Sequence, residues 1–401
     1  MDFALLIIFA VVGSCVGSFL NVLIYRMPRG ESVVFPSSHC PRCGRAIRWY
    51  DNVPLVSWLV LKGRCRFCKE PISPRYLLIE ATSAVLVGGL YSWFFILDMR
   101  EGAGEFIDAW PVFLAHAALL GGLLACSVVD MQHWIVPLEV CWVVAFIGVL
   151  SAGAAPHPFM PKVCPVAGAM GLAAVVGMGL AMLLRKQGVI ADSFTTGAQG
   201  ARAARDNLPS DQSKAGEKIV SVGYTSQHGV NPRREILREV VFLTPSIVLA
   251  CAAYLVLTFV PGAGRAWSAI ASPGEWFLSA RINGVLSAVL GFVVGGLWVW
   301  MTRILGTLGF GREAMGRGDV HILACAGAVT GWIVPSLAFF IAPFFGLSSA
   351  LYVLIRRNQR ELPYGPWLAA AVTAVILFYD GLMELIEPIR QTLEVFFAVN
   401  W

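Results

Sequence analysis

Charged residues are scarce in this chain, and their scarcity excludes an ordinary water-soluble protein. Asp, Glu, Lys and Arg make up 14% of its 401 residues, whereas hydrophobic residues make up 57%. A soluble domain carries roughly 25% charged residues. The surface is therefore too apolar to face water, and lipid must cover most of it.

Positive charge is also in small excess, because the formal net charge is +5 at pH 7. Bulk electrostatics therefore give no case for nucleic-acid binding.

The first apolar run, residues 3–25, lacks a basic n-region and a small-residue cleavage site, and Asp2 is its only early charge. We expect this run to be a retained helix rather than a cleaved signal peptide.

Long apolar runs, in contrast, are abundant. Runs of about 20 residues have the length of a helix that spans roughly 30 Å of hydrocarbon. The sequence therefore predicts an all-α polytopic membrane protein of about 8–10 transmembrane helices, since helices satisfy their own backbone groups in lipid. The candidate spans are residues 3–25, 76–97, 111–129, 134–153, 163–184, 240–260, 283–304, 319–335, 336–355 and 364–382.

These runs and the polar stretches between them predict five parts. The parts are a first transmembrane helix (1–25), a cytoplasmic four-cysteine module (26–75), transmembrane helices with a first aspartate (76–184), an insert (185–239) and further transmembrane helices (240–401). The insert is rich in Gly, Ser and Ala and has no helical or strand period, so we expect it to be flexible.

Basic residues in the loops predict the orientation in the membrane. Ten Lys and Arg residues lie in the 26–75 loop, whereas the 98–110 loop contains one. Cytoplasmic loops carry the excess of Lys and Arg. We therefore expect the 26–75 loop to be cytoplasmic and the N-terminus to be outside.

Four of the ten cysteines lie together in the polar 26–75 loop. They form two C-x-x-C pairs, Cys40 with Cys43 and Cys65 with Cys68. Two such pairs supply four thiolates for a closed tetrahedral zinc site, which is structural because no position is left for a reacting water. The sequence therefore predicts a small zinc-ribbon-like module. Its alternative is a redox C-x-x-C pair or an accidental cluster.

Two aspartates lie at the expected cytoplasmic ends of spans, Asp130 after one span and Asp319 at the start of another. A single acid at a helix end is usually a solvated cap. Two aspartates held close together share one proton, and such a pair can activate water and protonate a leaving group. Gly316 and Gly318 precede the second aspartate and would permit a tight turn and close approach of a substrate.

Several motifs resemble the bifunctional prepilin peptidases, which are GxGD aspartic proteases of family A24. The matching segments are GSFLNVLIYRMPRG at 17–30, the four-cysteine region at 40–80, GRGD at 316–319, the segment of Asp130, Ile135 and Pro137, and ELPYGPWLAAA at 361–371. The resemblance covers roughly residues 13–153 and 283–380.

This resemblance implies a bacterial inner-membrane enzyme with Asp130 and Asp319 as catalytic residues at the cytoplasmic face. Members of the family remove the basic leader of type IV prepilins or pseudopilins, the substrates of type IV pilus and type II secretion machinery. They then methylate the new N-terminus with S-adenosylmethionine. No residue of this chain can be named as a contact for that cofactor.

The chain also departs from the family pattern. His321 stands where a basic residue usually follows GxGD, and the stretch between the aspartates is longer than expected because of the insert and an extra pair of spans. Three other hypotheses therefore stay open. They are a presenilin-like protease with deeper aspartates, a transporter that uses the aspartates as an ion relay, and an inactive assembly factor.

Overall fold

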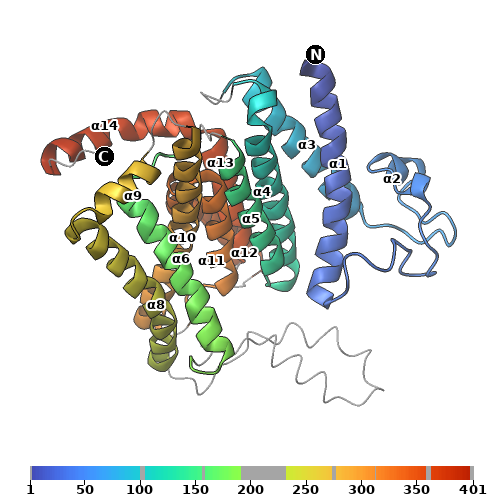
Figure 1. Cartoon of the computed structure of the whole chain (residues 1–401). Coiled ribbons are helices and arrows are strands. Elements are labelled where there is room, and N and C mark those ends of the chain that lie inside the picture. The colour runs from blue at the N-terminus through green and yellow to red at the C-terminus, as the bar shows by residue number, and fades with distance from the viewer. Residues whose placement is uncertain are drawn as a thin grey trace.

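Helices make up the regular structure of the described chain. The computed structural model describes residues 2–99, 104–155, 159–190, 232–272, 277–311, 313–357 and 363–397. Two isolated β-bridges accompany the helices in this part. The helices are α1 Asp2–Arg26, α2 Val56–Val60, α3 Pro74–Tyr91, α4 Phe106–His133, α5 Leu138–Ala154, α6 Pro165–Lys186, α8 Pro232–Phe259, α9 Ala263–Ala271, α10 Phe277–Phe310, α11 Arg317–Thr330, α12 Ile333–Arg357, α13 Gly365–Leu377 and α14 Tyr379–Phe397 (Figure 1).

The helical membrane architecture is confirmed. The number of described helices that are long and apolar enough to span a membrane is smaller than the expected 8–10. Six helices of the described chain are long and apolar enough to cross a membrane, or seven if α13 and α14 count as one bent span. Two further apolar helices, Leu138–Ala154 and Ile333–Ser348, are shorter. The predicted span at residues 364–382 contains a sharp bend, because α13 and α14 meet at an angle of 81°.

The predicted span at residues 319–335 is corrected. In its place lies α11, which has 14 residues. At 1.5 Å per residue such a helix is about 21 Å long, less than the roughly 30 Å of a hydrocarbon core. It ends at Gly331, whose φ of 77° breaks the helix. Nearly all of its side chains are buried, so α11 is a central helix enclosed by its neighbours.

Small residues allow this enclosure. A Cβ atom added to Gly327 of α11 would lie 2.0 Å from the carbonyl oxygen of Gly291 on α10. On the other side, a Cβ atom at Gly148 of α5 would lie 2.7 Å from the carbonyl oxygen of Ala328. Backbones in membrane proteins approach this closely where small residues line the contact. The position of the last turn of α11 is thereby fixed by two neighbouring helices.

In the sequence, the four-cysteine module lies between α1 and α3. These two helices pack side by side. Gly17 of α1 leaves room for the backbone of Glu80, because an added Cβ would lie 2.7 Å from its Cα atom. The buried Glu80 side chain accepts a hydrogen bond of 2.7 Å from the backbone N–H of Leu55 in the module. This bond attaches the module to the end of the helix pair, on the right in Figure 1.

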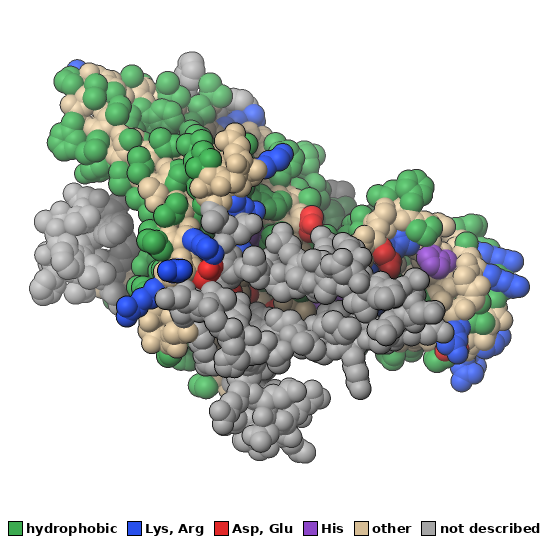
Figure 2. All heavy atoms as spheres, turned by 90° about the horizontal axis from the view of Figure 1, so that it is seen from below, with side chains coloured by type: hydrophobic (Ala, Val, Ile, Leu, Met, Phe, Trp, Pro, Cys, Tyr) green, Lys and Arg blue, Asp and Glu red, His purple; other side chains and the backbone are tan. Residues whose placement is uncertain are grey.

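The expected insert lies mainly outside the described residues. Its final part, however, is helical, because α8 begins at Pro232 and not near residue 240. Proline is tolerated at the start of a helix, where its missing N–H has no partner to lose. Glu235 and Arg238 add an ion pair of 2.6 Å within this turn. Figure 2 views this end of the molecule, where Lys and Arg side chains gather on the module and beside the helices.

Candidate active site and metal centre

Asp130 lies near the end of α4 and its carboxylate turns inward. Trp134 ends the helix in a left-handed conformation, with φ at 57°, and its N–H donates to the Asp130 carbonyl oxygen over 2.9 Å. The Asp130 side chain is buried, and its Oδ2 accepts a hydrogen bond of 3.1 Å from the backbone N–H of Gly365. The first N–H groups of a helix have no partner within it. Asp130 therefore caps the start of α13.

Asp319 occupies the third position of α11 and is also buried. Its carboxylate accepts a hydrogen bond from the backbone of Gly316, the residue that precedes the helix. This is the position from which an acidic side chain reaches back to cap a helix start. Asp319 also lies close enough to Asp130 to interact with it electrostatically. The structure therefore brings together two acids that are 189 positions apart in the numbering.

The two aspartate segments touch through Gly318. A Cβ atom added there would lie 2.4 Å from Cγ2 and 2.5 Å from Cβ of Val136, in the loop that follows α4. The second glycine of the GRGD segment thus permits close contact between two parts of the chain. Gly316 has an extended backbone, with φ at −68°, that any residue can adopt. An added Cβ there would meet Asp319 Oδ2 at 3.4 Å.

Gly365 and Tyr364 are site residues that the sequence analysis did not select individually. An added Cβ at Gly365 would lie 2.7 Å from Asp130 Oδ2 and 3.2 Å from Ile322 Cδ1, so this glycine closes the space between α4 and α11. Tyr364 interacts electrostatically with Asp319. In the sequence, these two residues were indicated by the YGP letters of the segment 361–371, which resembles the family. His321 turns elsewhere, and its Nδ1 lies 3.1 Å from the Arg317 carbonyl oxygen.

The four-cysteine module has two matching turns. Gly44 N–H donates to the Cys40 carbonyl oxygen over 2.8 Å, and Lys69 N–H donates to that of Cys65 over 3.0 Å. Both donors have left-handed backbones, with φ at 68° and 58°. A β-bridge flanks each turn at equivalent positions, His39 with Ala46 and Arg64 with Pro71.

These turns bring the four thiols together, so Cys40, Cys43, Cys65 and Cys68 could hold a metal ion. Their sulfur atoms all lie within 4.8 Å of one another. The Sγ atoms of Cys40 and Cys68 are 3.8 Å apart. A tetrahedral zinc site with bonds of about 2.3 Å has sulfur–sulfur edges of about 3.8 Å, so the geometry fits such an ion. Backbone N–H groups of Cys68 and Phe67 lower the pKa of the Cys65 thiol to about 7, which favours the thiolate that binds metal.

The module and the aspartate pair lie at the same end of the helices. Arg75, at the start of α3, donates a hydrogen bond of 2.7 Å to Gln132, two residues after Asp130. Within the module, Arg66 binds Asp51 through two nitrogen atoms, and this bond lowers the pKa of the Asp51 carboxyl. The ion pair therefore stabilises the module internally, and the hydrogen bond from Arg75 joins the module to α4, the helix that carries Asp130.

Comparison with known proteins supports this architecture. A family model described as the bacterial peptidase A24 N-terminal domain matches residues 11–94. A prepilin leader peptidase/N-methyltransferase of Vibrio cholerae is 41% identical over 178 residues, which cover 34% of this chain and 70% of that protein. The chain belongs to the prepilin leader peptidase/N-methyltransferase family.

Other relatives match over smaller shares of their length. A prepilin leader peptidase/N-methyltransferase of Myxococcus xanthus is 45% identical over 130 residues, or 32% of this chain and 35% of the relative. A type 4 prepilin-like proteins leader peptide-processing enzyme of Escherichia coli is 36% identical over 176 residues, which cover 39% of this chain and 60% of that protein. The chain thus spans between a third and two thirds of these two relatives. No solved structure matches it significantly.

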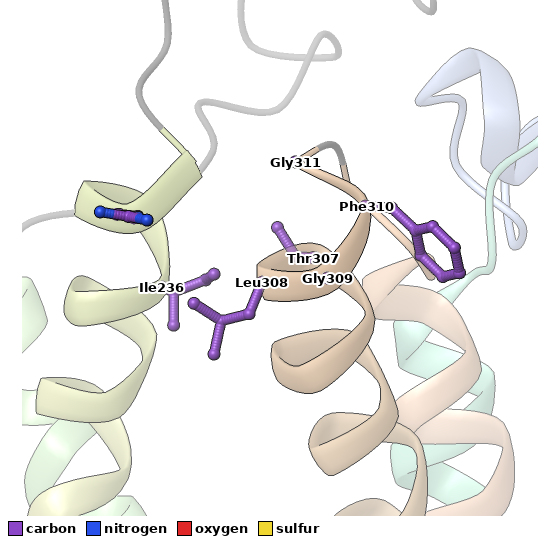
Figure 3. A pocket seen from close by; sticks show the side chains of 7 residues that line it. Ile236, Thr307, Leu308, Gly309, Phe310 and Gly311 are labelled. Carbon is purple, nitrogen blue, oxygen red and sulfur yellow. The ribbon is translucent and has the colours of Figure 1, made fainter.

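A cavity of about 480 Å³ lies between the start of α8 and the end of α10 (Figure 3). Arg233, Ile236 and residues 307–311 line it. Neither aspartate belongs to this lining, so the cavity is not the space in which the two carboxyls meet. It borders the loop that leads from α10 to Asp319.

Proposed function

We propose that this chain is a membrane aspartic endopeptidase that removes the leader of type IV prepilins or pseudopilins. The observation that carries the proposal is the meeting of Asp130 and Asp319, two buried acids from α4 and α11, in a chain of this family. Structural ion pairs rarely consist of two acids, because like charges repel. A pair that shares a proton is instead suited to acid–base chemistry.

The proposed reaction uses both protonation states of the pair. The ionised carboxylate takes a proton from water, whose oxygen then bonds to the carbonyl carbon of the scissile peptide. The protonated carboxyl donates a hydrogen bond to the carbonyl oxygen. When the intermediate collapses, the C–N bond breaks and the leaving nitrogen accepts a proton from the pair. Gly365 and Gly316 hold the two carboxyls in place through their backbone N–H groups.

The proposed location is the bacterial inner membrane, with the pair at the cytoplasmic face and the N-terminus outside. The hydrogen bond between Arg75 and Gln132 supports a common side for the module and the pair. The module carries ten of the 30 Lys and Arg residues of the chain, and loops rich in basic residues favour the cytoplasm. A basic leader followed by an apolar helix could then approach the acids while its apolar part stays in lipid.

The four-cysteine module is proposed to hold a structural zinc ion. A loop of this length has little core of its own, so metal binding would supply much of its folding energy. Methylation of the new N-terminus with S-adenosylmethionine is proposed from the names of the relatives. No side chain of this chain is assigned to that donor. Contacts with pilus or type II secretion machinery belong to the same proposal.

Co-expression with prepilins from the same genome tests the peptidase function. Mass spectrometry of the pilin should show a new N-terminus with the wild-type enzyme, and an added methyl mass if the second activity is present. Asp130→Asn and Asp319→Asn should each abolish cleavage, because removal of a catalytic acid costs about 10²- to 10⁴-fold in rate. Cleavage by either variant at the wild-type rate would exclude the pair. If the wild type cuts no prepilin, proton flux through the aspartates becomes the next measurement.

A further inference from the structure

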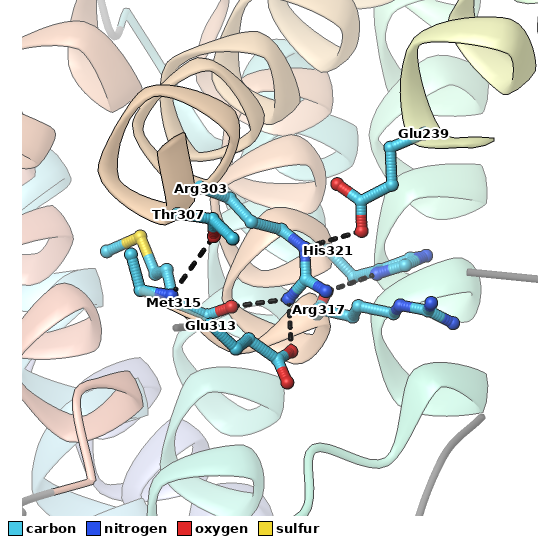
Figure 4. Close-up of polar contacts among 8 residues, drawn as sticks. Glu239, Arg303, Thr307, Glu313, Met315, Arg317 and His321 are labelled. Atoms are coloured by element: carbon cyan, nitrogen blue, oxygen red, sulfur yellow. Dashed lines mark hydrogen bonds and ion pairs between the residues drawn. The ribbon is translucent and has the colours of Figure 1, made fainter. Parts of the chain in front are cut away.

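Arg303 of α10 is a fully buried charge outside the aspartate pair. Its side chain is 1% exposed, and it extends toward three partners from two segments (Figure 4). Its Nε lies 2.8 Å from Glu239 Oε1, and its Nη1 lies 2.6 Å from Glu313 Oε1. Nη1 also donates to the carbonyl oxygen of Met315. A planar guanidinium holds several acceptors in one fixed geometry, which a lysine cannot do.

Two of these partners belong to the loop that leads to Asp319. Glu313 and Met315 lie between the end of α10 and the start of α11. The residue between them, Ala314, donates its backbone N–H over 3.2 Å to Oγ1 of Thr307, one turn after Arg303. Side chains of α10 therefore hold three consecutive loop residues. The next residue is Gly316, whose backbone bonds the Asp319 carboxylate.

The third partner comes from a different part of the chain. Glu239 lies on α8, within the stretch between the two aspartates that we expect from the sequence to be longer than in the family. Its side chain is 4% exposed. Glu239 also interacts electrostatically with Arg317, the second residue of the GRGD segment. A buried charge depends strongly on each partner, since removing one leaves it uncompensated.

We propose that Arg303 is a positioning residue for the Asp319 loop, and that Glu239 makes the extra helix α8 part of the active-site scaffold. This inference rests on the proposed peptidase function. The guanidinium fixes the loop through Glu313 and Met315, and Glu239 keeps the guanidinium aimed at them. The extra segment is therefore required for the geometry of the acid pair and is not a passive insertion.

The test compares Glu239→Gln and Arg303→Lys with Glu235→Gln in the purified full-length enzyme. Glu235 lies one turn before Glu239 on the same helix, is also buried, and pairs locally with Arg238. A prepilin in detergent or vesicles gives kcat and KM, and thermal unfolding gives the folded fraction. A displacement of about 1 Å can cost on the order of 100-fold in rate. We expect kcat to fall about 10- to 100-fold for Arg303→Lys and about 10-fold for Glu239→Gln, with KM within about twofold. Glu235→Gln should stay within about twofold of the wild type in kcat.

Each outcome decides one question. A wild type that cuts no prepilin refutes the proposed function itself. If the wild type cuts and Glu239→Gln matches Glu235→Gln in kcat, the positioning role is wrong. The same holds if the loss of activity equals the loss of folded protein, because the ion pair would then be structural only. Should Arg303→Lys fail to fold, the isosteric Glu239→Gln variant still decides between these outcomes.

Discussion

Replacing Gly318 by alanine should displace the two aspartates relative to each other. The added methyl carbon would lie 2.4 Å from Val136 Cγ2 and 2.5 Å from Val136 Cβ. Carbon atoms in contact lie about 3.5–4.0 Å apart, so the first turn of α11 and the loop after α4 must separate by roughly 1 Å. Asp319 follows Gly318 directly, and Asp130 precedes the same loop. The separation therefore acts on both carboxyls.

The expected size of the effect follows from this displacement. A shift of about 1 Å at reacting groups can reduce the rate on the order of 100-fold, which corresponds to about 2.7 kcal/mol in activation free energy. Overpacking of this kind costs about 1–3 kcal/mol in the free energy of unfolding. Gly318→Ala should therefore cut prepilin about 100-fold more slowly while most of the protein remains folded. Gly316→Ala, with a nearest contact of 3.4 Å, should have a smaller effect.

Prepilin cleavage followed by mass spectrometry, together with thermal unfolding in detergent, measures both quantities. Gly179→Ala is the control, because nothing lies within 4 Å of a Cβ atom added there. Val136→Gly removes the clashing carbons and should restore part of the activity in the Gly318→Ala background. The reasoning is wrong if Gly318→Ala cuts as fast as Gly179→Ala, or if Val136→Gly brings no recovery.

Three other predictions concern the remaining contacts. Gly365→Ala places a methyl carbon 2.7 Å from Asp130 Oδ2 and should lower kcat at least about 10-fold in the cleavage assay. Gly327→Ala, 2.0 Å from the Gly291 carbonyl oxygen, should lower the free energy of unfolding by about 1–3 kcal/mol; an unchanged melting temperature would contradict the packing. Cys65→Ser should lower bound zinc, measured by atomic emission, from about one ion per chain and expose the module to protease. Equal zinc in this variant and the wild type would refute the ligand set.

The four-cysteine module was predictable because its geometry is local. Each C-x-x-C pair places two thiols on one tight turn, and the same turn occurs twice at the same offsets. The sequence therefore contained all four thiols of the cluster. It did not contain the attachment of the module, which depends on the hydrogen bond between Leu55 and Glu80 and on the contact between Arg75 and Gln132.

The aspartate pair was only partly predictable. Charge asymmetry between the loops predicted one common side for Asp130 and Asp319, but their proximity depends on how α4, α5 and α11 pack. Gly365 lies in the resembling segment 361–371, but it was not selected individually, because its role as a backbone N–H donor to Asp130 does not depend on side-chain chemistry. The expected span at residues 319–335 differs from the shorter α11 for a related reason. A window of apolar residues does not distinguish a helix that faces lipid from a short helix enclosed by other helices.

The enclosure of α11 has a direct consequence for the chemistry. Its 14 residues cannot cross the hydrocarbon core alone, and glycines on α10 and α5 fix it against their backbones. Asp319, in its first turn, is therefore held by a packed protein core rather than by lipid. If a prepilin is the substrate, as proposed, it would meet this acid at a place that packed helices and the loop held by Arg303 together fix. The proposed general acid–base catalysis requires precise placement of two carboxyls, and the short central helix would supply it for Asp319.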